Sequence, residues 1–235
     1  MSGVGDGDPF CPLTVMRGLW PQSYFYDRQV DIIMAVRDSA ETYVVAGNEL
    51  GKDWILGRIA LAHMVYPWCF YPRAHFLGAE DREEMRLLAA RRGVAVSALP
   101  EWELHQRRVV TTSVKDKHLD VLWAEIGNAW RGCSEDLSAR FTMTHHEVRF
   151  RGEAEGKNPA SYLVGIVSGS ENFEGLTGHH AHYALAAGDE ASGLPDGVYE
   201  AVNTWMKRGV FITNPKPCAN FVRRNFRAGD LRAGI

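Results

Sequence analysis

The chain has 235 residues, a length typical of one α/β domain and too short for two full enzyme domains. Hydrophobic residues make up 46% of it and charged residues 23%, which excludes collagen-like, disordered and coiled-coil proteins. The net charge of −3 argues against a domain that holds nucleic acid passively on a basic surface. The four cysteines stand far apart without a CxxC pair, which favours reduced thiols over a zinc ribbon or a disulfide framework.

The first ten residues hold three Gly, two Asp and one Pro, so we expect residues 1–19 to form a flexible N-terminal arm. The domain proper is then expected over residues 20–235. No apolar stretch approaches the roughly 18 residues that cross a bilayer, and the acidic, Gly-rich start is unlike a signal peptide. These features predict a cytosolic protein with no membrane partner.

Helix and strand patterns alternate along the remaining chain. Apolar residues at helical spacing predict helices over 24–37 and 115–130. A strongly apolar run that stops at Pro67 predicts a helix over 53–66, and a segment that ends at Gly209 predicts one over 195–209. Acids at the front and arginines at the back predict a solvated surface helix over 79–92. Apolar or β-branched runs predict strands at 41–47, 107–113, 141–150, 161–169, 182–193 and 210–215. The alternation predicts an α/β fold with a mostly parallel central sheet flanked by helices on both faces.

The segment between the first strand and the second helix has the spacing of a phosphate-binding loop, with four residues between a small residue and Gly-Lys. It consists of Ala46, Gly47, Asn48, Glu49, Leu50, Gly51, Lys52 and Asp53. Backbone N–H groups of such a loop surround a β-phosphate, and Lys52 would neutralise charge at the β and γ positions. Asp53 occupies the place of the usual Ser or Thr, and its charge needs Mg²⁺ to separate it from the phosphates. Taken alone, the segment is equally compatible with an ordinary turn.

An acid pair, Asp189-Glu190, follows the apolar strand that begins at Tyr183. Asp189 is expected to hold Mg²⁺, together with Asp53, and Glu190 to orient and deprotonate an attacking water. Acid pairs after strands also occur in ordinary turns. Two partial matches in the correct order, each at the carboxyl end of a predicted strand, favour a nucleotide site.

The histidines form two groups whose role the sequence leaves open. His179, His180 and His182 precede the acid-ended strand, and His145 and His146 lie upstream. Imidazole clusters can bind zinc, but no carboxylate or cysteine stands at a matching spacing. A loop that packs near the nucleotide is therefore the favoured interpretation of the first group.

The end of the chain is basic. Residues 207–235 carry seven Lys or Arg residues against one acid, Asp230, a local balance of +6. Such a segment is a solvated face, a surface for DNA phosphates or a contact for a further domain.

Five segments in order resemble the ATPase domain of the large terminase subunits of tailed bacteriophages, over roughly residues 20–225. They are FYDRQVDII, AGNELGKD, RVVTTSVKDKHLDVLW, GLTGHHAHYALAAGDEASG and VFITNP. The resemblance implies an ASCE-type P-loop NTPase that hydrolyses ATP with Mg²⁺ and pumps double-stranded DNA into a procapsid in the host cytoplasm. It also implies that Gln29 contacts adenine and that Thr213, Asn214 and Pro215 couple the γ-phosphate state to movement. The implied partners are DNA, a portal protein, a small terminase subunit and further copies of the chain, monomeric when isolated and a homo-oligomeric ring when assembled.

The chain departs from this family in two respects. Many terminases carry an arginine finger inside the phosphate loop, but this loop has none, so a finger is expected from elsewhere, such as a neighbouring subunit. The unranked candidates are Arg131, Arg140 and Arg149. Terminases normally continue into an RNase H-like nuclease domain, whereas this chain ends at Ile235, so nuclease activity is not expected of it. The alternatives are a helicase-like ATPase fragment, which needs a second motor lobe, and a catalytically weak nucleotide-binding assembly module.

Overall fold

A computed structural model of the chain describes residues 10–47, 50–71, 90, 106–151, 161–168 and 173–228. Its helices are α1 (Pro12–Leu19), α2 (Asp27–Asp38), α3 (Lys52–Val65), α5 (Asp116–Arg131), α6 (Asp196–Asn203) and α7 (Phe221–Ala228). Its strands are β1 (Glu41–Val45), β2 (Arg107–Ser113), β3 (Phe141–Thr144), β4 (Glu147–Phe150), β5 (Tyr162–Val167), β6 (Tyr183–Asp189) and β7 (Arg208–Thr213). Short 3-10 helices are η2 (Pro67–Phe70), η5 (Leu137–Ala139), η7 (Glu174–Leu176) and η8 (Ala191–Gly193). None of the helices in the described ranges is both long and apolar enough to cross a membrane.

The seven strands form one sheet in the order β1-β7-β6-β2-β5-β4-β3. The five strands from β1 to β5 in this order are parallel, and β4 and β3 are antiparallel additions. The mostly parallel sheet predicted from the sequence is thus confirmed. Because β7 lies between β1 and β6, the carboxyl ends of these three strands meet at one edge, where ligands of open α/β sheets bind.

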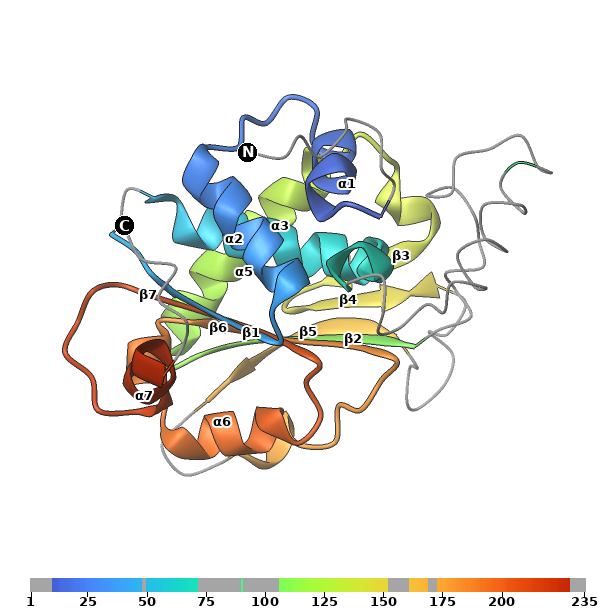
Figure 1. The fold of residues 1–235 in the computed structure, drawn as a ribbon. Helices are drawn as coiled ribbons and strands as arrows, with labels where there is room; N and C mark the ends of the chain where they lie inside the picture. The colour runs from blue at the N-terminus through green and yellow to red at the C-terminus, as the bar shows by residue number, and fades with distance from the viewer. Residues whose placement is uncertain are drawn as a thin grey trace.

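Helices cover both faces of the sheet (Figure 1). α1, α2, α3 and α5 lie on one face and α6 and α7 on the other, and each face has its own hydrophobic core. α3 contacts α1 and α5 as well as β2 and β6, so it is buried nearly all round. All seven residues of β6 are buried, as expected for an inner strand covered on both faces.

Glycine permits α5 to lie close to the sheet. A Cβ atom at Gly165 of β5 would lie 2.3 Å from Nε1 of Trp123, a residue of α5. That same Nε1 donates a hydrogen bond of 3.0 Å to Thr111 Oγ1 on β2. The absence of a side chain at position 165 therefore lets the indole lie across two strands at once.

The single edge strand predicted over 141–150 is wrong. Residues Phe141–Thr144 and Glu147–Phe150 form two antiparallel strands, joined by a turn at His145 and His146. His146 has a φ of 56°, the left-handed conformation that reverses the chain. The weak alternation of this segment concealed the turn because no Gly, Asn or Pro marks it.

Three other boundaries differ from expectation. The helix predicted over 195–209 ends at Asn203, and Gly209 lies inside β7, where a Cβ atom would approach the Phe211 ring to 2.8 Å. The strand predicted over 182–193 ends at Asp189 and is followed by η8. Residues 12–19, which were expected to belong to a flexible arm, form α1 instead, with Met16 and Leu19 buried. The helix predicted over 79–92 lies outside the described residues.

Candidate functional site

The predicted phosphate loop joins the carboxyl end of β1 to the start of α3. Ala46 N donates to Thr213 O at 2.9 Å, which ties the start of the loop to the end of β7. Gly51 has φ 68° and ψ 46°, a conformation that glycine adopts without strain, and Lys52 is the first helical residue. Because Gly51 has no side chain to cap α3, the first-turn amides and the positive end of the helix dipole face the loop and suit an anion. Asn48 and Glu49 lie outside the described residues.

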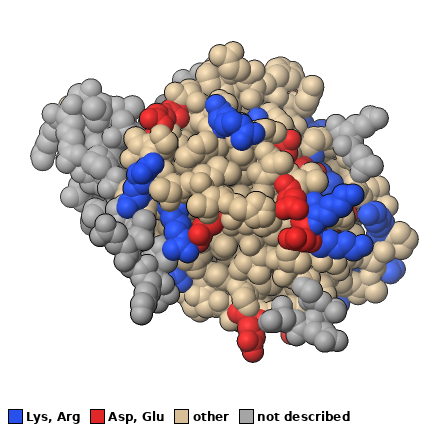
Figure 2. All heavy atoms as spheres, turned by 180° about the vertical axis from the view of Figure 1, so that it is seen from behind, with Lys and Arg blue, Asp and Glu red and all other residues tan. Residues whose placement is uncertain are grey.

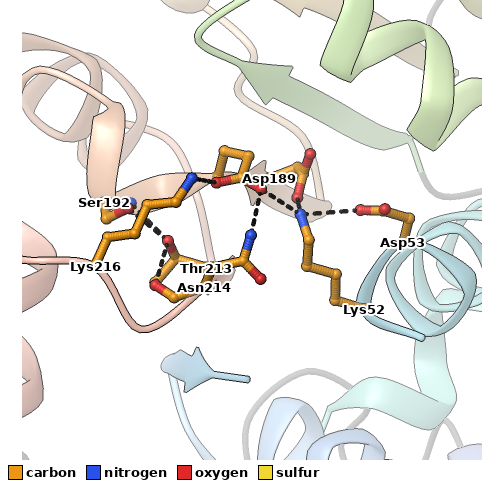
Figure 3. Close-up of polar contacts among 8 residues, drawn as sticks. Lys52, Asp53, Asp189, Ser192, Thr213, Asn214 and Lys216 are labelled. Atoms are coloured by element: carbon orange, nitrogen blue, oxygen red, sulfur yellow. Dashed lines mark hydrogen bonds and ion pairs between the residues drawn. The ribbon is translucent and has the colours of Figure 1, made fainter. Parts of the chain in front are cut away.

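Lys52 connects the loop to the acid pair (Figure 3). Its Nζ donates to Asp189 Oδ1 at 2.7 Å and to Glu190 Oε1 at 2.8 Å, and it lies 3.4 Å from Asp53 Oδ1. Burial alone would lower the pKa of Lys52, but the hydrogen bonds to the two acids outweigh burial and raise it. The lysine is therefore charged at every physiological pH. The structure brings together residues 137 positions apart that the sequence assigned to one site.

The two acids have pKa values shifted in opposite directions. Asp189, the last residue of β6, is 2% exposed, and this burial raises its pKa to about 6 despite the hydrogen bond from Lys52. Burial also disfavours the charge of Glu190, but the hydrogen bonds and positive charges of Lys52 and Lys216 together outweigh burial and hold the pKa of Glu190 below its ordinary value. Environments that separate the pKa values of neighbouring acids are typical of sites that give them different roles.

The backbone at Glu190 is strained. Its φ of 50° and ψ of 40° are left-handed, which costs a residue with a side chain on the order of 1 kcal/mol. Its carboxylate accepts a hydrogen bond of 2.9 Å from Asn214 Nδ2 and one of 3.4 Å from Lys216 Nζ. These contacts hold Glu190 in place and connect it to the segment after β7.

The predicted coupling motif lies beside the acids. Thr213 ends β7, and its Oγ1 lies 2.6 Å from Ser192 Oγ and accepts a hydrogen bond of 3.2 Å from Ser192 N (Figure 3). Asn214 reaches Glu190 as described, while Pro215 is exposed. The motif therefore bonds to Glu190 itself and to Ser192, two residues further along the chain.

Gln29 contacts the loop itself. It is 3% exposed, and its Oε1 accepts from Tyr26 N at 3.2 Å while its Nε2 donates to Leu50 O at 3.1 Å. Both ends of the amide are thus occupied within the protein. The side chain joins the start of α2 to the phosphate loop.

Asp53 and Asp189 supply the donors that Mg²⁺ prefers. Asp53 Oδ1 is buried and makes no hydrogen bond with any described residue, although it lies 3.4 Å from Lys52 Nζ. Its charge adds to the raised pKa of Asp189, so the two carboxylates face the same space. A buried carboxylate oxygen without a hydrogen bond beside a second carboxylate fits a hard cation.

The three candidate arginine fingers lie toward the amino ends of the parallel strands, whereas the acid pair lies at the carboxyl end of β6. Arg149 on β4 pairs with Tyr162 at the start of β5, level with Ala184 of β6. Asp189 lies five residues further along, about 17 Å at ~3.3 Å per residue. Arg149 is therefore too far away to reach the phosphate loop of its own chain.

Arg131 and Arg140 are similarly placed. α5 begins after the carboxyl end of β2 and runs back for 16 residues, so Arg131 at its end is about 24 Å along the helix from the site edge. Arg140 pairs with Glu135 at 2.8 Å and lies over the Tyr66 ring, just beyond the far end of α3. Neither serves as a finger within its own chain in this arrangement.

A cavity of about 360 Å³ lies beside the loop and includes residues that sequence reasoning missed. It is lined by Val45, Thr213, Asn214, Lys216, Pro217, Cys218, Val222, Arg223 and Phe226. Arg223 lines this cavity together with Asn214 and Lys216, which both bond to Glu190. The apolar side chains of Val45 and Phe226 are partly exposed there. The basic composition of residues 207–235 was the only signal in the sequence for Lys216 and Arg223, and it gave no position for them.

The basic segment does not form one continuous basic surface in its described part. Arg208 is buried, donating to Phe70 O and Arg37 O, and Arg224 pairs with Asp196 at 2.9 Å. Figure 2 shows lysines and arginines in separate groups on one face, several of them adjoining acidic side chains.

His179 is occupied by contacts within the protein. Its Nδ1 lies 2.6 Å from Tyr162 Oη, and its Nε2 lies 2.8 Å from Gly175 O. Both ring nitrogens of His179 are engaged in these contacts, so His179 is a poor metal ligand in this conformation. A zinc site formed by His179, His180 and His182 would therefore lack one of its three ligands.

The sheet order, the loop that leads into α3 and the flanking helices define the class of fold. The chain has the mostly parallel α/β fold expected of a P-loop protein, and it shares this fold with the structures it resembles. Among solved structures, it is similar to the ATPase domains of phage large terminases.

The large terminase of bacteriophage HK97 matches with a TM-score of 0.52 and 13% identity, over 86% of this chain and 36% of that one. The ATPase domain of the Thermus phage P74-26 large terminase matches with a TM-score of 0.59 and 13% identity, over 91% of this chain and 73% of that one. A mutant of the same domain gives the same TM-score over 74% of its length. No family model and no curated protein matches the chain. The chain thus spans about a third of the HK97 protein, and at 13% identity the likeness establishes the fold.

Proposed function

We propose that the chain is an ATP-hydrolysing motor domain of the terminase type, which powers translocation of double-stranded DNA into a procapsid. The observation that supports this most strongly is Lys52 at the start of α3, hydrogen-bonded to both Asp189 and Glu190, in a fold similar to phage terminase ATPase domains. Phosphoryl transfer requires an anion site, a bound cation and a base. Lys52, the carboxylates proposed to hold the cation, and Glu190 as the proposed base lie within one network of contacts.

The proposal gives each group a role. The β- and γ-phosphates of ATP draw Lys52 away from the acids and bind the first-turn amides of α3. Asp189 and Asp53 would hold Mg²⁺, which would neutralise phosphate charge. Glu190, no longer bonded to Lys52, accepts a proton from the attacking water. Asn214, which bonds to Glu190, would move with this carboxylate and displace the end of β7. Gln29 holds the loop against α2 throughout.

The partners of the motor follow from the terminase likeness. DNA, a portal protein, a small terminase subunit and further copies of the chain in a ring are proposed on that basis. The second candidate is a catalytically weak nucleotide-binding assembly module, favoured by the three acids around Lys52, which the phosphates of ATP must displace. A helicase-like fragment would need a second lobe to complete its site. ATP turnover with DNA and portal present separates the first two: an assembly module binds ATP without turning it over.

The central test separates the two acids. Glu190→Gln keeps the shape of the side chain and removes the base, so Mg-ATP should bind while hydrolysis falls at least about a hundredfold. Asp189→Asn should weaken Mg²⁺-dependent nucleotide binding itself. Calorimetry and phosphate release measure both, with Glu200→Gln, an exposed acid of α6, as the control. Normal binding and hydrolysis in both variants would contradict the proposal.

A further inference from the structure

A second cluster of metal-binding side chains lies away from the nucleotide site. It joins Asp120 of α5 to His145 and His146 in the turn between β3 and β4, and their ligand atoms all lie within 4.8 Å of one another. Nε2 of His146 is 2.9 Å from Asp120 Oδ1, and Nε2 of His145 is 3.5 Å from the same oxygen. The sequence showed the two histidines without a carboxylate, because Asp120 precedes them by 25 and 26 positions and lies on another element.

The backbone fixes the position of His146. Its φ of 56° is unusual for a residue with a side chain, and its carbonyl accepts a hydrogen bond of 2.9 Å from Gly165 N. The imidazole lies against the Trp123 ring, with centroids 5.5 Å apart. The side chain is only 14% exposed, so this ligand is built into the fold.

The His146 ring nitrogen is unsatisfied within the described part of the chain. Its Nε2 is buried and makes no hydrogen bond there, although Asp120 Oδ1 is near, because the contact lacks hydrogen-bond geometry. The His145 ring stacks on the His146 ring at 3.8 Å, with an angle of 24° between the planes. The two rings therefore present their Nε2 atoms side by side to one carboxylate. An ion between them would satisfy the buried nitrogen.

We propose that Asp120, His145 and His146 bind a divalent transition-metal ion, with Zn²⁺ as the matching ion and water in the fourth position. Two imidazoles and a carboxylate suit Zn²⁺ and disfavour Mg²⁺, which prefers an all-oxygen set. Zn–N and Zn–O distances of about 2.0–2.2 Å require donors roughly 3.3 Å apart, so donors that lie up to 4.8 Å apart must close by up to about 1.5 Å. The side chains of His145 and Asp120, which are 83% and 51% exposed, have room for that movement.

The bound ion would join the hairpin tip to α5. Without it, the β3–β4 turn is held to α5 mainly by the Asp120 contacts and the Trp123 ring. Binding to the folded state alone raises stability by mass action, so Zn²⁺ should raise the melting temperature. The proposal is independent of ATP hydrolysis.

The test is a titration of the full chain, without a histidine tag, with Zn²⁺ alone. Calorimetry should show one saturable site, and Co²⁺ should give the visible absorption of a tetrahedral site. His145→Ala, His146→Asn and Asp120→Asn should each weaken binding at least about tenfold, since loss of even an indirect partner costs that much. Asn tolerates the left-handed backbone at position 146. His180→Ala, which removes an exposed histidine outside the cluster, should bind as the wild type does.

Equal Zn²⁺ affinity in the wild type and all three variants would overturn the proposal, as would the absence of saturable binding. Displacement of Zn²⁺ by Mg²⁺, with both ions at the same millimolar concentration, would also overturn the proposal. If His146→Asn fails to fold, His145→Ala decides the outcome, because a side chain that is 83% exposed does not support the fold. The Zn²⁺-induced rise in melting temperature should disappear in His145→Ala and remain in His180→Ala.

Discussion

Lys52 is held by Asp53, Asp189 and Glu190. It is the positive side chain at the start of α3, and the N–H groups behind it cannot compensate for its loss. Lys52→Ala should therefore lower ATP turnover by a hundredfold or more, on the order expected for loss of a single electrostatic stabiliser. Steady-state phosphate release measures this, with Lys117→Ala on the exposed face of α5 as the charge-matched control. Near wild-type turnover would show that the loop is not the nucleotide site.

The raised pKa of Asp189 predicts a pH dependence. Burial favours the protonated form up to about pH 6, whereas Mg²⁺ needs the carboxylate. Mg-ATP binding should therefore weaken as the pH falls through about 6, and Mg²⁺ binding near that pH should release a proton. Calorimetry in two buffers of different ionisation enthalpy detects the proton. Binding that stays constant between pH 5 and 8, with no proton released, would remove Asp189 from the metal site.

At the scale of elements, the contact between α5 and the sheet depends on a missing side chain. Gly165→Ala would place a methyl group 2.3 Å from Trp123 Nε1, displacing the indole from Thr111. Overpacking of this kind costs about 1–3 kcal/mol, and the lost hydrogen bond adds about 1 kcal/mol. Urea unfolding should therefore show the variant to be clearly less stable.

Gly18→Ala is the matched control for that substitution. Gly18 lies in α1, and a Cβ atom added there would meet nothing within 4 Å. Alanine there should not destabilise the protein, and it should raise the free energy of unfolding by at most roughly 0.5–1 kcal/mol, the value for a helix interior, because Gly18 is the next-to-last residue of the helix. Equal effects of the two substitutions would mean that Trp123 does not lie over Gly165.

At the scale of the whole molecule, the position of the arginines predicts a shared active site. Arg131, Arg140 and Arg149 lie far from their own phosphate loop, so a finger from this set would act on a neighbouring subunit. A finger in trans accounts for roughly three to five powers of ten in turnover, so the isolated chain should be a slow ATPase. Its specific activity should rise with protein concentration, or on adding portal and DNA.

Dilution of the protein tests the opposite mechanism, in which the finger belongs to the same chain. A high specific activity that stays constant down to a demonstrated monomer would place the finger within the same chain. Arg223, which lines the cavity beside the acid pair, is then the residue to substitute. Arg223→Lys would keep the charge and remove the bidentate geometry, and it should lower turnover only under that mechanism.

Local patterns in the sequence identified most of the elements. The strand over 107–113 matches β2 residue for residue, and the helices over 53–66 and 115–130 match α3 and α5 within one residue at each end. Local pattern succeeds here because β2 and α3 are nearly continuous buried runs and α5 buries one apolar face at helical spacing. It failed at 141–150, where a left-handed His146 reverses the chain without any turn residue to mark it.

By itself, the sequence determined the α/β class, the order of the motifs and the acid pair at the end of a strand, because these depend on residues close together in the chain. Only the tertiary structure decided which distant groups meet. The order β1-β7-β6 joins Lys52 to Asp189, and the packing of α5 against the hairpin brings Asp120 to His146. The tertiary structure also placed Arg131, Arg140 and Arg149 away from the site, toward the amino ends of the parallel strands, and Arg223 in the cavity beside Asn214. Such pairings are set by strand order and side-chain packing across the whole domain, which no local spacing records.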